Sequence, residues 1–303
     1  MNTTHHPTRI EIPRIRGFDL ETFEKDYRHP TQPVIINQAV SDWPALNKWS
    51  PQYFRDTFAD QQVQPCLSLS ASEVPYFSTD QQHRRSLAMK EFIDIMQSDQ
   101  SCYLDQSDIK AFQAIANDYQ LDTLMPTGSH FTSLWIGNNT RSGLHYDNMD
   151  NFFIQIYGEK RVTLLAPDAA KYVYPFGDNI SKSQVDPEQA DLKKYPRFAK
   201  ATLLVSQLTP GDVLFLPRGW WHHFSSLGTS ISVSCWHGQS LTIAEQVRGV
   251  NLAGKHLWLR IFRDFIWHGL CKRRYQQRLF SSPPTGKILY DLIFHPNRLA
   301  KPD

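Results

Sequence analysis

Two histidines and one aspartate, placed beside strand-like segments, constrain this 303-residue chain more than any other feature. His145 and Asp147 stand two residues apart, and His222 follows the aspartate by 75 residues. On an extended segment residues i and i+2 point to the same side, so the first two side chains can reach one ion. Two imidazoles and one carboxylate on one face of an iron leave coordination positions open for other ligands. We therefore expect a fold that brings residue 222 back to residues 145–147.

The second histidine of this set is ambiguous in the sequence, because His222 and His223 are adjacent. Neighbouring residues on a strand face opposite sides, so only one of the two can be a ligand. An isolated histidine is more often an ordinary, partly buried side chain. Three ligand-type residues in a strand context favour a metal site over that interpretation.

Short strand-like runs separated by turn residues fill the chain from Phe131 onward. The predicted strands are 132–136, 152–157, 161–166, 201–208, 213–216 and 230–236, with turns at 158–159, 210–212 and 227–228. Several short antiparallel strands around a metal indicate a mainly β fold, with a double-stranded β-helix (jelly-roll or cupin) core. The polar 168–200 stretch is expected to be a long insertion between core strands.

Helices are expected on both sides of this core. The first part of the chain predicts a short helix at 20–27, a buried strand at 33–36, and helices that begin at Ser50-Pro51, at Ser86 and at Ser107, the last running to about Tyr119. After Gln239 an apolar helical face is formed by Trp258, Ile261, Phe262, Phe265, Ile266 and Leu270. We therefore divide the chain into a catalytic domain at 1–239, with an N-terminal helical and strand flank, and a basic helical segment at 240–303.

The charge of the chain is concentrated in that C-terminal segment. Residues 248–303 contain eleven lysines and arginines against three acidic residues, a balance of +8, whereas the whole chain carries +2. The basic residues include Lys272-Arg273-Arg274 and Arg278. Such a segment suggests an anionic partner such as tRNA, and its apolar face suggests a helix pair in a homodimer. An anionic membrane surface is the least favoured partner.

Neither a membrane span nor secretion is indicated. No window reaches 18 consecutive apolar residues, and the N-terminus lacks the apolar stretch of a signal peptide. The four cysteines, Cys66, Cys102, Cys235 and Cys271, show no CxxC spacing. We therefore expect reduced thiols in a cytoplasmic protein.

Several motifs resemble those of the JmjC family of Fe(II)/2-oxoglutarate oxygenases. Residues 151–161 (NFFIQIYGEKR) and 211–223 (GDVLFLPRGWWHH) resemble the asparaginyl hydroxylases of its small hydroxylase branch. Residues 145–151 (HYDNMDN) and 194–198 (KYPRF) resemble its tRNA wybutosine hydroxylases, and 33–49 is typical of the same group. The resemblance runs from about residue 30 to 240 and implies that His145, Asp147 and His222 bind the iron.

The resemblance implies roles for further residues. Lys160 would pair with the distal carboxylate of 2-oxoglutarate, since a buried carboxylate needs a charged partner. Without the resemblance, Lys160 would be interpreted as a solvated turn residue. The other implied contacts with 2-oxoglutarate or the metal surroundings are Tyr103, Asn151, Ser142 and the aromatic wall Trp236. Ser234 departs from the asparaginyl hydroxylases, which have asparagine there.

These features predict an oxygenase that uses Fe(II), 2-oxoglutarate and O₂ and releases succinate and CO₂. We expect a protein side chain as the substrate, because compact JmjC proteins mostly hydroxylate and no chromatin-reading or zinc module is visible. A tRNA base is the alternative, suggested by the 145–151 motif and the basic segment. A small-molecule hydroxylase and a non-enzymatic cupin-type binding protein are further alternatives, and Lys160 with the intact metal-ligand set argues against the latter.

Overall fold

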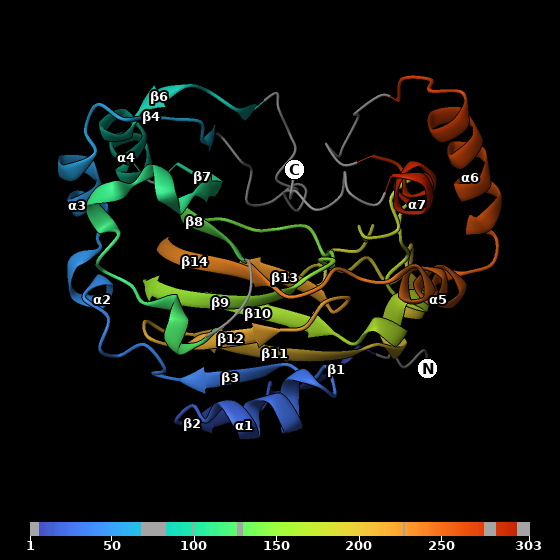
Figure 1. The fold of residues 1–303 in the computed structure, drawn as a ribbon, viewed down its shortest axis with the longest axis horizontal. Helices are drawn as coiled ribbons and strands as arrows, with labels where there is room; N and C mark the ends of the chain where they lie inside the picture. The colour runs from blue at the N-terminus through green and yellow to red at the C-terminus, as the bar shows by residue number, and fades with distance from the viewer. Residues whose placement is uncertain are drawn as a thin grey trace.

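Two β-sheets pack against each other at the centre of the protein, and helices flank them at both ends (Figure 1). The computed structural model describes residues 6–67, 83–98, 100–125, 130–226, 228–275 and 283–295. The larger sheet has the order β2 (Arg14–Arg16), β3 (Val34–Asn37), β12 (Val213–Leu216), β9 (Asp150–Tyr157), β14 (Thr229–His237), β8 (His130–Asn138), β7 (Cys102–Asp108) and β5 (Cys66–Leu67). The smaller has the order β1 (Thr8–Ile10), β11 (Thr202–Leu208), β10 (Lys160–Leu165) and β13 (Trp221–Ser225). The predicted cupin-type core is confirmed.

Apolar residues from both sheets meet between them. On the larger sheet Ile35, Phe153 and Leu214 point inward, and on the smaller sheet Val162 and Leu164 face them. All five side chains are buried, at 3% exposure or less. The alternation of apolar residues along these strands therefore produces the inner layer that a two-sheet fold requires.

The short turn between β9 and β10 carries the chain from the larger sheet to the smaller one. Gly158 makes this turn with φ +66°, and a Cβ at this position would lie 2.1 Å from the backbone oxygen of Thr229. Only glycine can take this conformation so close to another strand. The turn sets Lys160 at the start of β10, where its side chain is buried.

The helices form two groups along the sequence. The first group comprises α1 (Leu20–Phe23) with a π-helical turn at Glu24–Arg28, α2 (Ala45–Lys48), α3 (Pro51–Thr57) and α4 (Met89–Gln97). The second comprises α5 (Ile243–Ala253), α6 (Leu257–Asp264) with a π-helical turn at Phe265–Leu270, and α7 (Thr285–Phe294). In Figure 1, α2–α4 lie at one end of the sheets and α5–α7 at the other. Ser50 caps α3 as predicted, since its Oγ accepts a hydrogen bond from the Tyr53 amide at 3.1 Å.

Two local predictions were wrong, and one strand was missed. The helix expected from Ser107 is instead the end of β7 followed by 3₁₀ turns at Ile109–Ala111 and Gln113–Ile115, because β7 pairs with β8 as far as Asp108. The helix expected from Ser86 begins at Met89, after a two-residue strand β6 (Leu87–Ala88) that pairs with β4 (Gln62–Val63). Strand β13 was not predicted, and it carries His222. The 168–200 stretch contains 3₁₀ turns at Pro167–Lys171 and Pro196–Lys200, in agreement with an insertion.

The predicted apolar face of the C-terminal helix is divided. Ile261 is buried and Phe265 partly buried, whereas Phe262 and Leu270 are 64% and 56% exposed. The homodimer through this face stays a prediction. Among the described residues, no helix combines the length and apolarity needed to cross a membrane.

Candidate metal site

The backbone pairs the two histidines of the predicted metal site directly. The His145 amide donates to the His222 carbonyl at 3.1 Å, and the His222 amide donates to the His145 carbonyl at 2.6 Å. These two hydrogen bonds place His145 directly opposite His222, the second residue of β13. The backbone of Asp147 is also fixed, because its carbonyl accepts a hydrogen bond from the Gly219 amide at 2.9 Å. Gly219 precedes β13 by two residues.

The three side chains converge. One ligand-type atom from each of His145, Asp147 and His222 lies within 4.8 Å of the other two. Nε2 of His145 is 3.9 Å from Oδ1 of Asp147, and Nε2 of His222 is 3.8 Å from Oδ2. This donor set of two nitrogens and one oxygen fits a first-row transition metal such as Fe(II).

Carbonyl groups orient both imidazoles. Nδ1 of His145 donates to the Gly143 carbonyl at 2.7 Å, and Nδ1 of His222 donates to the Trp220 carbonyl at 3.0 Å. A proton on Nδ1 leaves the lone pair on Nε2, the atom that faces Asp147. Burial lowers the pKa of both histidines, and the nearby Lys182 lowers that of His145 further. Burial therefore favours the neutral form, which is the form that binds metal, at both histidines.

His222 and His223 have separate positions, as strand alternation requires. His223 is fully buried on the other side of β13, where its Nδ1 donates to the Ser142 carbonyl at 2.5 Å. Its Nε2 is 3.7 Å from Glu188. The geometry thus brings His222, and not His223, to His145 and Asp147.

A cavity of about 90 Å³ opens over these side chains. The predicted residues Tyr103, Ser142, Asn151 and Trp236 line it, and so does Ser234. Trp236 donates from Nε1 to Oδ2 of Asp147 at 2.9 Å, which fixes the carboxylate. Oδ1 of Asn151 is buried and has no hydrogen-bond partner among the described residues. A buried acceptor without a partner marks a place where a bound molecule would donate or a metal-held water would sit.

Lys160 is buried next to Tyr103, which lines this cavity. It is only 1% exposed, and its Nζ is 3.3 Å from the Tyr103 hydroxyl. Its ammonium also lies 5.2 Å from the centre of the Phe153 ring. Burial lowers the pKa of Lys160 to about 7. No acidic side chain is paired with it among the described residues, so the position fits a lysine that receives the carboxylate of a small molecule.

Several residues of the cavity were not predicted from the sequence. Lys182 lines it from the 168–200 insertion, beside Gln106, Trp135, Phe153 and Phe224. Lysine in a polar loop carries no sequence signal of its own, because most such lysines are solvated. The ring centres of Phe153 and Phe224 lie 4.3 Å apart, a contact between β9 of one sheet and β13 of the other. This contact was not predicted because β13 itself was not predicted.

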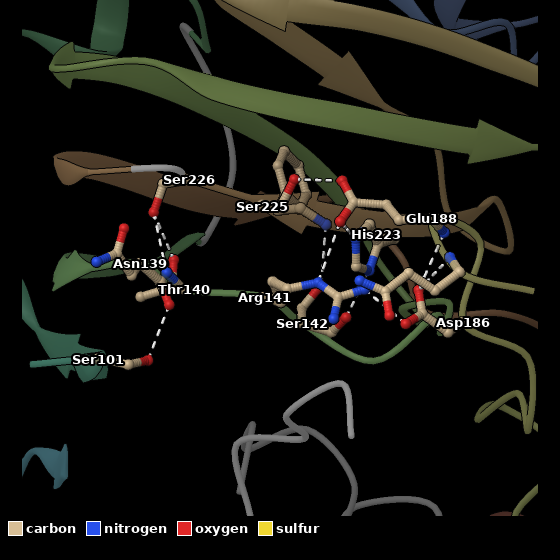
Figure 2. A network of polar contacts seen from close by, with 12 residues as sticks. Ser101, Asn139, Thr140, Arg141, Ser142, Asp186, Glu188, His223, Ser225 and Ser226 are labelled. Atoms are coloured by element: carbon tan, nitrogen blue, oxygen red, sulfur yellow. Dashed lines mark hydrogen bonds and ion pairs between the residues drawn. The ribbon is translucent and has the colours of Figure 1, made fainter. Parts of the chain in front are cut away.

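A polar network links the 168–200 insertion to Arg141 and to β13, the strand that carries His222 (Figure 2). Arg141, which precedes the first ligand, contacts Asp186 at 2.5 Å and Glu188 at 3.1 Å, and its side chain is 9% exposed. Glu188 also accepts from the Ser225 hydroxyl at 2.6 Å. The contacts with His223, Ser225 and Arg141 lower the pKa of Glu188 to about 2.

Replacing Glu188 with alanine is expected to destabilise the protein by about 2 kcal/mol, because it leaves Arg141 buried without this partner. This loss of stability is smaller than that expected for a fully buried ion pair, because the Glu188 side chain is 21% exposed. The stabilisation should be complete above pH 4.5 and disappear as the pH falls toward 2, because the folded pKa is the lower one. Urea unfolding at pH 7 and at pH 3 measures both effects. The matched control is Asp60→Ala, which breaks the exposed ion pair with Lys90. An equal loss in both variants would contradict the prediction.

Comparison with known proteins agrees with this architecture. Residues 20–243 match the family model described as a cupin-like domain. The chain therefore belongs to the cupin-like family, and its relatives place it among the JmjC proteins.

Two kinds of relative stand out. The chain is 32% identical over 240 residues to Lysine-specific demethylase 8 of Xenopus tropicalis, a match that covers 74% of this chain and 52% of the relative. It is 30% identical over 251 residues to tRNA wybutosine-synthesizing protein 5 of Gallus gallus, covering 75% of this chain and 78% of the relative. The chain thus spans between 52% and 59% of the length of the first two demethylase relatives.

Proposed function

We propose that this protein is an Fe(II)- and 2-oxoglutarate-dependent oxygenase that hydroxylates a protein side chain. The single observation that supports this most is the convergence of His145, Asp147 and His222 beside a cavity whose wall includes Tyr103, the partner of the buried Lys160. JmjC membership supports the same class of reaction.

Each residue of the cavity has a definable task. Nε2 of His145, Nε2 of His222 and the Asp147 carboxylate would hold Fe(II), with Trp236 keeping the carboxylate oriented. Lys160 and the Tyr103 hydroxyl would bind the distal carboxylate of 2-oxoglutarate. When bound, iron with 2-oxoglutarate and O₂ supplies the oxidation that places one oxygen atom on a C–H bond and yields succinate and CO₂. The rings of Trp135, Phe153 and Phe224 line the cavity with apolar surface, which would limit the access of water to the reacting groups.

A tRNA base is a second candidate substrate, and one observation favours it. The match with the tRNA wybutosine-synthesizing relative covers 78% of that protein, against 52% for the demethylase. The basic residues Lys272, Arg273 and Arg274 are exposed after α6, where they could contact phosphates. Arg278, the other basic residue predicted to contribute, lies outside the described residues.

The test is a search for product in two pools. We expect the wild-type protein, given Fe(II), 2-oxoglutarate and O₂, to form succinate and to add about 16 Da, one oxygen atom, to members of a total peptide pool. His145→Ala should do neither. A gain of mass in a total tRNA pool alone would favour the RNA alternative, and loss of a methyl group from peptides would indicate demethylation. Failure of the wild type to take up metal would instead support a binding protein.

A further inference from the structure

A second cavity, separate from the one over the metal ligands, lies beside α5. Its volume is about 320 Å³, which is within the range of small-molecule sites. Tyr146, which stands between two of the metal ligands in the chain, lines it, and so does Trp221, which precedes the third. Neither residue lines the cavity over the metal ligands. Adjacent residues of an extended segment face opposite sides, so the two cavities lie on opposite sides of the segments that carry the ligands.

The wall of this second cavity is mostly apolar. Ile180, Leu241 and Leu252 contribute aliphatic surface to it. Tyr146 and Trp221 contribute aromatic surface, and their rings pack edge to face with centres 5.0 Å apart. An aromatic ring in the cavity could add a further contact of this kind. The wall therefore fits a ligand with a large apolar group, and an aromatic group in particular.

Gly249 leaves space in this cavity. It lies in the interior of α5 (Ile243–Ala253) and lines the cavity, and a Cβ at this position would have no atom within 4 Å. Glycine is less favourable than alanine inside a helix, and here neither a left-handed backbone nor close packing requires it. The absence of a side chain at this position is thus a local cost to the helix that leaves the cavity open.

Four charged side chains line the cavity, and two of them are paired with each other. Nη2 of Arg218 is 3.2 Å from Oε1 of Glu245. The other two are Arg248 of α5 and Asp168 of the 3₁₀ turn Pro167–Lys171, which packs against α5. Both are exposed, and their side chains form no ion pair or hydrogen bond within the part of the chain that the structure describes. One unpaired cation and one unpaired anion therefore lie at the rim of an apolar cavity.

We propose that this cavity binds a free α-amino acid with an aromatic side chain, whose carboxylate contacts Arg248 and whose ammonium group contacts Asp168. Such a ligand satisfies both unpaired charges, whereas a fatty acid or another simple anion would bring its carboxylate near Asp168 without a compensating cation. The aromatic ring would lie against Tyr146 and Trp221, in the space beside Gly249. The site goes beyond the proposed oxygenase function and does not depend on it.

The experiment compares four ligands by calorimetric titration of the full chain: L-phenylalanine, N-acetyl-L-phenylalanine, L-phenylalaninamide and L-serine. The acetyl derivative lacks the ammonium charge, the amide lacks the carboxylate, and serine lacks the ring. No metal is added, because amino acids chelate divalent ions. At about pH 6 the α-amino groups are protonated and the carboxylates are ionised.

We expect the wild type to bind L-phenylalanine about tenfold more tightly than each of the other three ligands, equivalent to about 1.4 kcal/mol. Arg248→Gln should bind L-phenylalanine no more tightly than its amide, because the carboxylate has lost its partner. Asp168→Asn should bind L-phenylalanine no more tightly than its acetyl derivative, because the ammonium group has lost its partner. Each variant thus removes one preference and keeps the other.

Filling the cavity tests its location. Gly249→Leu should weaken the binding of L-phenylalanine at least tenfold, because the leucine side chain would occupy the space of the ligand. Its Tm should not fall, since leucine is a better helix former than glycine and no atom lies within 4 Å of the new Cβ. The matched control is Ala244→Leu, which places the same side chain at an exposed position of α5 that does not line the cavity, and it should bind as the wild type.

Three results would overturn the inference: no binding of L-phenylalanine by the wild type, equal binding by the wild type and Gly249→Leu, or equal binding of L-phenylalanine and its two derivatives. If Gly249→Leu does not fold, the two charge variants decide the question, because both alter exposed side chains. Both preferences retained in Arg248→Gln and in Asp168→Asn would then refute the assignment. None of these results depends on whether the protein forms succinate.

Discussion

His222→Ala is expected to lose bound metal and succinate formation together, by about a hundredfold or more. Even the outer hydrogen-bond partners of metal ligands typically contribute 10- to 100-fold, and His222 would be a ligand itself. Its Nε2 lies 3.8 Å from the Asp147 carboxylate and its Nδ1 is held by the Trp220 carbonyl. Metal content after anaerobic loading with Fe(II), together with succinate formed, measures the loss.

The adjacent histidine supplies the control. His223→Gln removes an imidazole of the same strand, but one that points to Ser142 and Glu188. We expect this variant to keep its metal and to lose stability instead. Loss of metal in His223→Gln with metal retained in His222→Ala would reverse the assignment of the ligand.

The affinity for 2-oxoglutarate is expected to fall as the pH rises above 7. Burial lowers the pKa of Lys160 to about 7, so above that pH the empty site must take up a proton before it can bind a carboxylate. The dissociation constant should rise by up to tenfold per pH unit above about 7 and change little just below it. Calorimetric titration of the Mn(II)-loaded protein without O₂ measures this.

Two variants isolate the contribution of Lys160. Lys160→Met should weaken 2-oxoglutarate binding about a hundredfold at pH 7 and abolish the pH dependence, given that hydrogen bonds to charged groups are worth about 1.5–3 kcal/mol. Without 2-oxoglutarate, the wild type should become more stable as the pH rises from 7 to 10.5, because the unfolded chain binds the extra proton. Lys160→Met should lack this contribution. An unchanged pH profile in Lys160→Met would assign the co-substrate to another residue.

The strands of the core were predictable, because their apolar residues alternate and their turns contain glycine and proline. The predicted strand at 213–216 agrees with β12 residue by residue, and the turn residue Gly158 has the positive φ expected there. Strand β13 was missed because the run Trp221-His222-His223-Phe224 does not alternate in polarity. Both of its histidines are buried, one toward the cavity and the other toward a carboxylate.

Residues of the site could be predicted only where their type and spacing, or a family motif, distinguish them from ordinary surface or core residues. The spacing of His145 and Asp147 on one strand-like segment indicated a shared ion. The role of Lys160 could be predicted only from the family resemblance, because a lysine after a turn is ordinarily solvated. In the structure the Lys160 side chain is buried. Lys182 and Glu188 come from an irregular insertion whose path is set by contacts with distant residues, and such contacts leave no periodic pattern in the sequence.

The reciprocal hydrogen bonds between His145 and His222 have a consequence for how the site is assembled. Because main-chain atoms position the ligand pair, folding alone brings the two histidine ligands together before any ion arrives. We expect the apoprotein to keep these two amides strongly protected from hydrogen exchange and to accept different divalent ions reversibly, with little structural rearrangement. A chain built in this way can lose its iron to a chelator and regain it without passing through an unfolded state.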